Sequence, residues 1–216
     1  MIPVKDTSSK GFAAVTILII IANIAMFFEE TRTGKALFDL YGVSPHDIYL
    51  NLINGRGSFL RMNLSIFVSG FMHGGYLHLF SNMLFLYVFG PSIEKELGWM
   101  RYVVFYTAAI FVSFYTHTLF FHNSDIIVVG ASGAIAAIMG IFIVLKPKAK
   151  ITSIIPIFFI IKIAQVPAFV FILIWFALQG LNGYFTIGAQ TSTAWFSHIG
   201  GFIMGFVYGA VYRLNR

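Results

Sequence analysis

Long apolar runs are the feature that most constrains the fold of this chain. The first run carries no charged residue between Lys10 and Glu29, and about 20 apolar residues are enough to cross a lipid bilayer as a helix. Of the 216 residues, 58% are hydrophobic and 10% are charged, whereas a soluble domain carries about 25% charged residues. The runs predict an all-α membrane protein, a bundle of six transmembrane helices at residues 11–28, 75–93, 102–121, 130–145, 167–185 and 194–212.

The length of the chain leaves room for one domain. We expect residues 1–216 to form a single transmembrane domain, with a long outer loop at about 29–74 and no separate soluble domain. The first apolar run lacks a small-residue cleavage site and is interpreted as a retained anchor. Two further apolar stretches, 62–72 and 151–161, are too short to cross the bilayer, so we expect them at the interface or folded against the bundle.

Lysine and arginine predict the orientation, because they accumulate in cytoplasmic loops. With the N-terminus inside, the outer side holds only Arg32, Lys35, Arg56 and Arg61. The inner side then holds the larger set: Lys5, Lys10, Lys95, Arg101, Lys146, Lys148, Lys150, Arg213 and Arg216. Both termini are therefore predicted to be cytoplasmic, in a multi-pass protein that we assign to a prokaryotic plasma membrane. Topology accounts for the net charge of +6, and no nucleic-acid partner is expected.

Four polar residues are expected at one depth in the membrane. In the predicted topology the second, fourth and sixth helices all run inward from the outer face, so their first turns share one level. Ser132 lies in the first turn of the helix at 130–145, and His198 lies about one turn into the last helix. His78 and Asn82, at i and i+4, face the same side of the helix at 75–93.

Small residues predict that two of these helices touch. They form stripes with a spacing of four on the fourth and sixth helices: Ser132, Ala136 and Gly140, and Gly201, Gly205 and Gly209. Such stripes allow helices to approach closely in lipid, where packing drives association. The approach would bring the His198 imidazole toward the Ser132 hydroxyl.

A serine hydroxyl becomes a nucleophile when a neighbouring base accepts its proton, and histidine is the commonest such base. The chain has no cysteine, which excludes thiol catalysis and thiolate metal sites. Its eight acidic residues lie in loops or at helix ends, none at the level of His198, so the prediction is a Ser132–His198 dyad. The Ser132 backbone N–H, with His78 and Asn82, would supply hydrogen-bond donors to a developing oxyanion.

Other functions are compatible with the same residues. Serine among small residues in a transmembrane helix usually serves packing, and an intramembrane histidine makes a structural hydrogen bond about as often as it catalyses. Intramembrane histidine and asparagine also occur in transporters, although the chain shows no paired repeat with broken helices. A haem or zinc site built from His73, His78 and His198 is a further alternative.

Four segments resemble the motifs of the rhomboid intramembrane serine proteases. "HGGYLHLFSNMLF" carries His73, His78 and Asn82, and "GASG" carries Gly130 and Ser132. "SHIGGFIMG" carries His198, Gly201 and Gly205, and "GPSIEKELG" carries Glu94. Order and spacing agree over about residues 70–210. Two features depart from the family pattern. The long first loop has only Leu60-Arg61, which lies upstream of where the family's Trp-Arg pair would fall, and Ala136 stands where an aromatic residue usually supports the catalytic histidine.

The resemblance implies an enzyme with a six-helix fold, in which Ser132 is the nucleophile and His198 the general base and acid. It implies an oxyanion hole formed by the Ser132 backbone N–H with His78 and Asn82. Gly130 would shape the loop before the nucleophile, Gly201 and Gly205 would support the helix contact, and Glu94 would be structural. His73 would sit in the outer polar cavity without an essential role.

The sequence therefore predicts an intramembrane serine endopeptidase that cleaves transmembrane segments of single-span membrane proteins near the outer membrane face. Its partners would be these substrates and the lipid bilayer, and it would need no metal or organic cofactor. The alternative is a catalytically inactive rhomboid-like protein that binds membrane clients.

Overall fold

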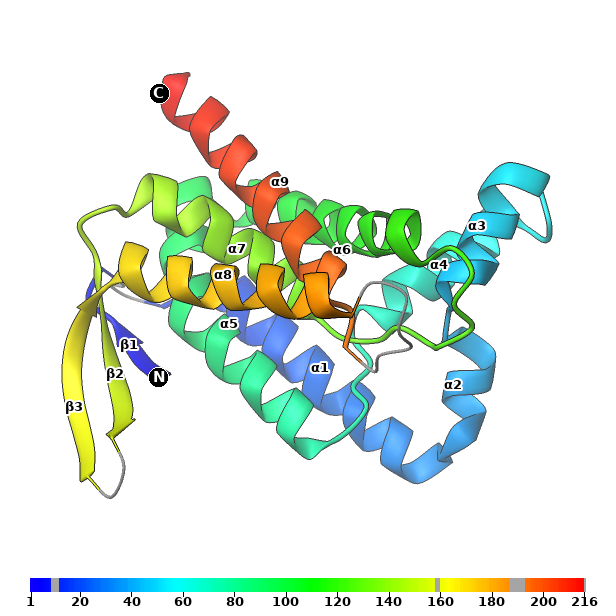
Figure 1. The fold of residues 1–216 in the computed structure, drawn as a ribbon, viewed down its shortest axis with the longest axis horizontal. Helices are drawn as coiled ribbons and strands as arrows, with labels where there is room; N and C mark the ends of the chain where they lie inside the picture. The colour runs from blue at the N-terminus through cyan, green and yellow to red at the C-terminus, as the bar shows by residue number, and fades with distance from the viewer. Residues whose placement is uncertain (9–11, 158–159, 187–192, 216) are drawn as a thin grey trace.

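The computed structural model describes residues 1–8, 12–157, 160–186 and 193–215. Six long helices form its main body (Figure 1). They are α1 (Ala14–Thr33), α5 (Tyr76–Leu97), α6 (Trp99–Phe121), α7 (Ser132–Leu145), α8 (Ala168–Phe185) and α9 (Trp195–Leu214). Each lies within a few residues of a helix predicted from hydropathy, so the helix positions are confirmed.

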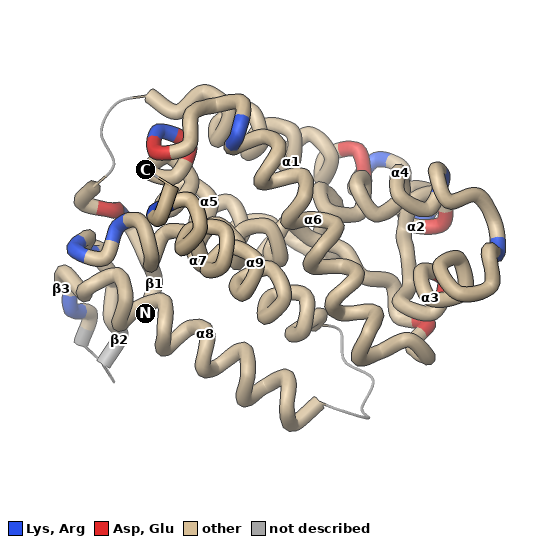
Figure 2. Tube along the Cα trace, turned by 90° about the horizontal axis from the view of Figure 1, so that it is seen from above, with Lys and Arg blue, Asp and Glu red and all other residues tan. Residues whose placement is uncertain are grey.

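Charged residues gather at the two ends of the bundle, and a long uncharged region separates them (Figure 2). Within the described residues, three helices are long and apolar enough to cross a bilayer: α1, α6 and α8. Helix α7 has 14 residues and is therefore about 21 Å long, shorter than the roughly 30 Å of hydrocarbon. A helix of this length leaves at least one of its ends short of the bilayer surface.

Helix α7 forms the centre of the bundle. Its residues from Gly133 to Phe142 are all buried, and it contacts α5, α6, α8 and α9. Small residues permit the contact with α9, since a Cβ at Gly201 would overlap the carbonyl oxygen of Gly133, and a Cβ at Gly205 would overlap that of Ala137. The predicted stripe on α9 is thus confirmed.

The predicted stripe on α7 needs a correction. Gly133 and Ala137 face α9, one residue further along than the predicted Ser132 and Ala136. Gly140 does belong to the contact, because a Cβ there would overlap the carbonyl oxygen of Phe202. Successive residues on a helix differ by about 100°, so this shift turns Ser132 to the edge of the contact. Ser132 is therefore left open on one side.

Between α1 and α5 lie three short helices: α2 (Lys35–Tyr41), α3 (Pro45–Asn54) and α4 (Phe59–Ser69). The side chain of Ser44 accepts a hydrogen bond from the Asp47 N–H and caps α3, whose first residue is proline. The apolar stretch predicted at 62–72 forms most of α4, and Ile66 is fully buried.

Backbone and side-chain hydrogen bonds fasten this outer segment to the bundle. The N–H of Val128 donates to the Val43 carbonyl at 2.9 Å, and the Tyr115 hydroxyl donates to the Asn63 side chain at 2.7 Å. Leu60, in contrast, is 80% exposed. The Leu60-Arg61 pair therefore does not replace the packing of a Trp-Arg pair, and other residues hold the segment.

A three-stranded antiparallel sheet is the part of the fold that hydropathy did not predict. It consists of β1 (Ile2–Asp6), β2 (Lys150–Ile157) and β3 (Ile160–Pro167), in the order β1-β2-β3. Of the stretch predicted at 151–161, residues 158–159 lie outside the described residues. The rest does fold against the bundle, as the contacts of β2 and β3 with α8 show, but as two paired strands. Its β-branched isoleucines favour strands, so the fold is mostly helical rather than wholly so.

At the same end of the molecule, Glu94 of α5 caps the start of α1. Its carboxylate accepts hydrogen bonds from the N–H groups of Val15 at 3.0 Å and Thr16 at 2.7 Å, and from the Thr16 hydroxyl at 2.7 Å. A carboxylate is favourable at a helix N-terminus, where it satisfies free N–H groups. This geometry supports the structural role expected for Glu94.

Candidate active site

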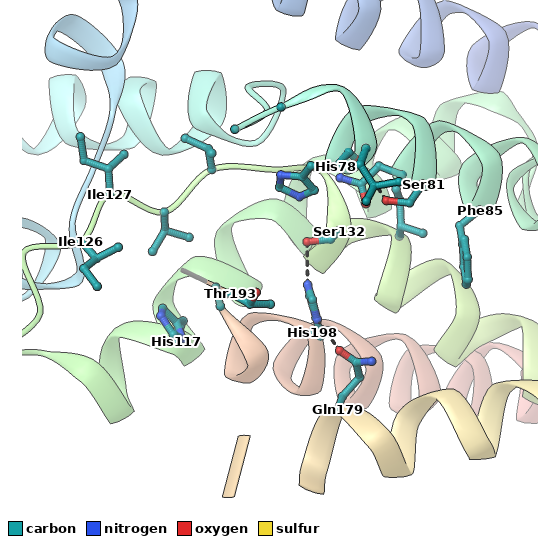
Figure 3. A pocket seen from close by; sticks show the side chains of 18 of the residues that line it. His78, Ser81, Phe85, His117, Ile126, Ile127, Ser132, Gln179, Thr193 and His198 are labelled. Atoms are coloured by element: carbon teal, nitrogen blue, oxygen red, sulfur yellow. Dashed lines mark hydrogen bonds between the residues drawn. The ribbon is translucent and has the colours of Figure 1, made fainter. Parts of the chain in front are cut away.

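Ser132 and His198 meet by a hydrogen bond between two neighbouring helices. The Ser132 Oγ lies 2.7 Å from the His198 Nε2 (Figure 3). Ser132 is the first residue of α7, and His198 lies in the first turn of α9. The glycine contacts between α7 and α9 bring the two backbones together, so the geometry expected from the small-residue pattern is present.

Gln179 of α8 makes the second hydrogen bond to the imidazole. Its Oε1 lies 2.7 Å from the His198 Nδ1, and its Nε2 donates to the Trp175 carbonyl at 3.3 Å. Gln179 was not among the residues predicted from the sequence, because an acid is the usual third member of such a site and none lies at the level of His198. The available signal was a glutamine in an otherwise strongly apolar helix, since polar side chains in such helices usually make interhelical hydrogen bonds.

Two tryptophans surround the same imidazole. The Trp175 ring centroid lies 5.9 Å from that of His198 at 37°, and the Trp195 centroid lies 6.1 Å away at 90°. Ala136 is fully buried within α7. The aromatic support that the family pattern places at position 136 therefore comes from α8 and α9 in this chain.

The predicted oxyanion donors lie on the other side of Ser132. Figure 3 shows His78 and His198 on either side of the serine. Because Ser132 begins α7, its backbone N–H belongs to the first turn, whose N–H groups have no acceptor within the helix. The three predicted donors, His78, Asn82 and this N–H, thus come from α5 and from the start of α7.

Gly130 is required by the position of His78. Its φ is +125°, a region that favours glycine, and a Cβ there would lie 2.8 Å from the His78 Cε1 and Nε2. The Gly130 N–H donates to the Ser69 carbonyl at 3.0 Å. The loop before Ser132 is thus held against the His78 ring, in agreement with the shaping role expected for Gly130.

His73 lies behind Asn82 rather than in the cavity, which corrects the position implied by the resemblance. It is 1% exposed and does not line the cavity. Burial, reinforced by the neighbouring His78, lowers the pKa of His73 to about 4. The neutral ring accepts a hydrogen bond at Nε2 from the Asn82 amide at 2.9 Å, because its Nδ1 faces the Phe71 carbonyl at 3.2 Å. This bond orients the Asn82 side chain.

A cavity of about 870 Å³ connects these groups. His78, Asn82, Ser132, Gln179 and His198 all line it. The volume lies within the range of about 300–1,000 Å³ that is usual for ligand sites.

His117 of α6 also lines the cavity and stacks on Phe121, with ring centroids 4.8 Å apart.

A haem or zinc site built from His73, His78 and His198 would need ring nitrogens that already form hydrogen bonds. Nε2 of His73 is bonded to Asn82, and Nε2 of His198 is bonded to Ser132. Within the described residues, no group of three or more His, Cys, Asp or Glu side chains is arranged to hold a metal ion.

Comparison with known proteins identifies relatives of this chain. Residues 60–215 match the family model described as Rhomboid domain. The chain is 30% identical to RHOMBOID-like protein 6, mitochondrial, of Arabidopsis thaliana over 142 residues, 65% of this chain and 40% of that protein. It is 31% identical to RHOMBOID-like protein 4 of the same plant over 140 residues, 65% of this chain and 32% of that protein.

A third Arabidopsis thaliana protein, RHOMBOID-like protein 1, is 29% identical over 152 residues, 69% of this chain and 34% of that protein. The chain thus spans less than half the length of these relatives. The matched family model covers α4 to α9 and includes Ser132, Gln179 and His198. On this evidence the chain belongs to the rhomboid family and is a multi-pass integral membrane protein.

Proposed function

We propose that this protein is an intramembrane serine endopeptidase that cleaves transmembrane segments of single-span membrane proteins near the outer membrane face. The observation that carries the proposal is the 2.7 Å contact between the Ser132 Oγ and the His198 Nε2 inside a cavity of about 870 Å³. A hydroxyl paired with an imidazole in this way is the arrangement of an activated nucleophile.

The proposed topology has six spans, both termini in the cytoplasm and a prokaryotic plasma membrane as the location. Its support is the charge at the two ends of the bundle. Among the described residues, the end that carries the sheet holds more lysines and arginines, including Lys146, Lys148 and Lys150 from the end of α7 to the start of β2. The other end holds Arg32, Lys35, Arg56 and Arg61, near α2, α3 and α4. Lysine and arginine are enriched on the cytoplasmic side of membranes. The start of α7 and the cavity would then face the outer side.

In the proposed reaction, His198 accepts the proton of the Ser132 hydroxyl while the serine oxygen attacks a substrate carbonyl carbon. The carbonyl oxygen becomes an oxyanion that receives hydrogen bonds from the Ser132 N–H, His78 and Asn82. His198 then gives the proton to the leaving amine, and an acyl-enzyme remains. Water, deprotonated by His198, attacks this ester and releases the carboxylic acid and the free serine.

The position of the site restricts the substrate. A carbonyl inside a helix already accepts a hydrogen bond, so a transmembrane substrate must unwind locally before attack. Unsatisfied backbone groups are expensive in lipid. The proposed substrate is therefore a single-span protein whose helix is weak, with small or glycine residues, close to the outer membrane face.

Substitution of the two central residues tests the proposal. Ser132→Ala and His198→Ala are expected to abolish cleavage of a reporter transmembrane substrate in liposomes, while the thermal unfolding midpoint in detergent stays within a few degrees of that of the unchanged protein. Ser58→Ala is the matched control, because Ser58 caps α4 outside the cavity. Cleavage that persists in both Ser132→Ala and His198→Ala would refute the dyad.

Covalent labelling separates an enzyme from a client-binding relative. A fluorophosphonate probe is expected to label the unchanged protein and Ser58→Ala at Ser132, and to leave Ser132→Ala unlabelled. A protein that binds transmembrane clients, shows no cleavage and takes no label would belong to the inactive class instead.

A further inference from the structure

Gln179 lies on the side of the His198 ring opposite Ser132. The bond between its Oε1 and the His198 Nδ1 measures 2.7 Å, as short as the bond between His198 and Ser132. Gln179 is 7% exposed and His198 is 9% exposed, so neither side chain exchanges this bond freely with water. A buried polar pair of this kind constrains both partners, because an unpaired group there would be costly.

The amide of Gln179 is held in one orientation by its own helix. Its Nε2 donates to the Trp175 carbonyl one turn earlier in α8, at 3.3 Å. With the NH₂ group used in this way, the oxygen is the atom that faces His198. An oxygen can only accept, so the His198 Nδ1 carries the proton and donates it to Gln179.

The position of this proton decides what the other ring nitrogen can do. A neutral imidazole has one N–H and one lone pair. With the proton on Nδ1, the lone pair lies on Nε2 and points at the Ser132 hydroxyl, as a general base requires. In the opposite tautomer, Nε2 would donate to the serine oxygen and could not take its proton.

We propose that Gln179 is a positioning residue that selects the Nδ1–H tautomer of His198 and holds its ring in line with Ser132. The inference rests on the proposed function and adds a neutral third member to the Ser132–His198 pair. An amide carries no charge into the low-dielectric bundle, and its oxygen can accept from Nδ1 both in the neutral ring and in the imidazolium.

The position of α8 explains how the His198 ring is supported in a chain that has Ala136 in place of an aromatic residue. Trp175 and Gln179 are four residues apart and lie on one face of α8, where both contact His198. The ring thus receives an aromatic contact and a hydrogen bond from one helix face. Part of the support that the family pattern places on α7 thus comes from α8 in this chain.

Gln179→Leu is the main test, because leucine keeps much of the volume and removes the acceptor. We expect kcat for the reporter substrate to fall about 10- to 100-fold, with KM within about twofold, because the tautomer that can act as base becomes a minority. Gln179→Glu is expected to restore most of kcat, since a carboxyl oxygen accepts from Nδ1. Asn182→Leu removes an amide from the same helix without removing a contact to His198 and serves as the matched control.

A spectroscopic measurement separates positioning from simple structural support. In protein labelled with ¹⁵N-histidine, with the His198 signals assigned by difference from His198→Ala, we expect the Nδ1–H tautomer in the unchanged protein and in Asn182→Leu. In Gln179→Leu the Nε2–H form should become the majority. An unchanged tautomer in Gln179→Leu, or an unchanged kcat, would overturn the proposal.

The same measurements distinguish failure of this inference from failure of the proposed function. If the unchanged protein neither cleaves the reporter nor takes the fluorophosphonate label, the endopeptidase is rejected, and the ¹⁵N spectra alone decide whether Gln179 selects the tautomer. If cleavage and labelling are present but Gln179→Leu behaves like Asn182→Leu, the endopeptidase stands and Gln179 has no positioning role.

Discussion

Two of the helices that pack against α9, namely α7 and α8, contact it in different ways. Against α7 it packs backbone on backbone, with the α-carbons of Gly201 and Gly205 beside the carbonyls of Gly133 and Ala137. Against α8 it packs through side chains, with Phe176 stacked on Phe202 at 4.1 Å and Gln179 bonded to His198. The backbone contact sets the separation of Ser132 and His198, and the side-chain contact sets the orientation of the histidine ring.

The largest expected effect is at the backbone contact. A methyl group at Gly205 would overlap the Ala137 carbonyl oxygen, which belongs to the backbone and cannot rotate away. We expect Gly205→Ala to destabilise the bundle by about 3 kcal/mol and to remove nearly all cleavage, because the helices must separate. Thermal unfolding in detergent and the reporter assay measure both effects. A stable and active variant would mean that the α7–α9 contact is looser than described.

Gly130→Ala should affect activity more than stability. Alanine at a φ of +125° is strained, and its Cβ would push against the His78 ring. We expect kcat to fall about 100-fold, the loss typical of one missing oxyanion donor. The unfolding midpoint should drop only slightly, since the residue lies before α7 rather than between helices. A variant that unfolds early but keeps its kcat would place the role of Gly130 in folding instead.

Gly183 tests whether the α8–α9 contact is as tolerant as its geometry indicates. A Cβ there would meet Phe196 and Trp195 at 3.4 Å, an ordinary van der Waals distance. We expect Gly183→Ala to change stability by less than about 1 kcal/mol and to leave cleavage within about twofold. Destabilisation equal to that of Gly205→Ala would show that the two faces of α9 do not differ.

The smallest effect is expected at Gly180, where a Cβ would meet no described residue within 4 Å apart from the surrounding backbone of its own helix. Alanine is favoured over glycine in a helix by up to about 1 kcal/mol. Gly180→Ala should therefore raise the unfolding midpoint by a small amount, and labelling of Ser132 should be unchanged. A fall in the midpoint would indicate a backbone contact of α8 with another segment.

Much of the fold could be predicted from the sequence, for a physical reason. A bilayer requires a helix that crosses it to be apolar over about 20 residues, so the positions of α5 and α6 follow from hydropathy. The sheet was not predicted, because a short isoleucine-rich stretch is equally compatible with a strand and with a buried helix. This stretch forms a strand because it pairs with Ile2–Asp6, nearly 150 residues away in the chain.

The candidate site, too, could be predicted only in part from the sequence. Ser132 and His198 were predicted to meet because the expected depth in the membrane and the glycine spacing can both be read from the sequence. Gln179 was not predicted, since no spacing rule links it to His198. Its role depends on how far α8 is rotated about its own axis, and that rotation comes from packing against α9.

The sequence by itself determined that this is a membrane protein and where its long helices lie, and it predicted which polar side chains would come together. These properties depend on the identity of residues near one another in the chain and on the thickness of the lipid. Only the tertiary structure decided which face of α7 meets α9, which side chain stands behind His198 and how the terminal strand joins the hairpin. Such features depend on rotations and contacts between distant segments, whose free energies arise only when the helices pack.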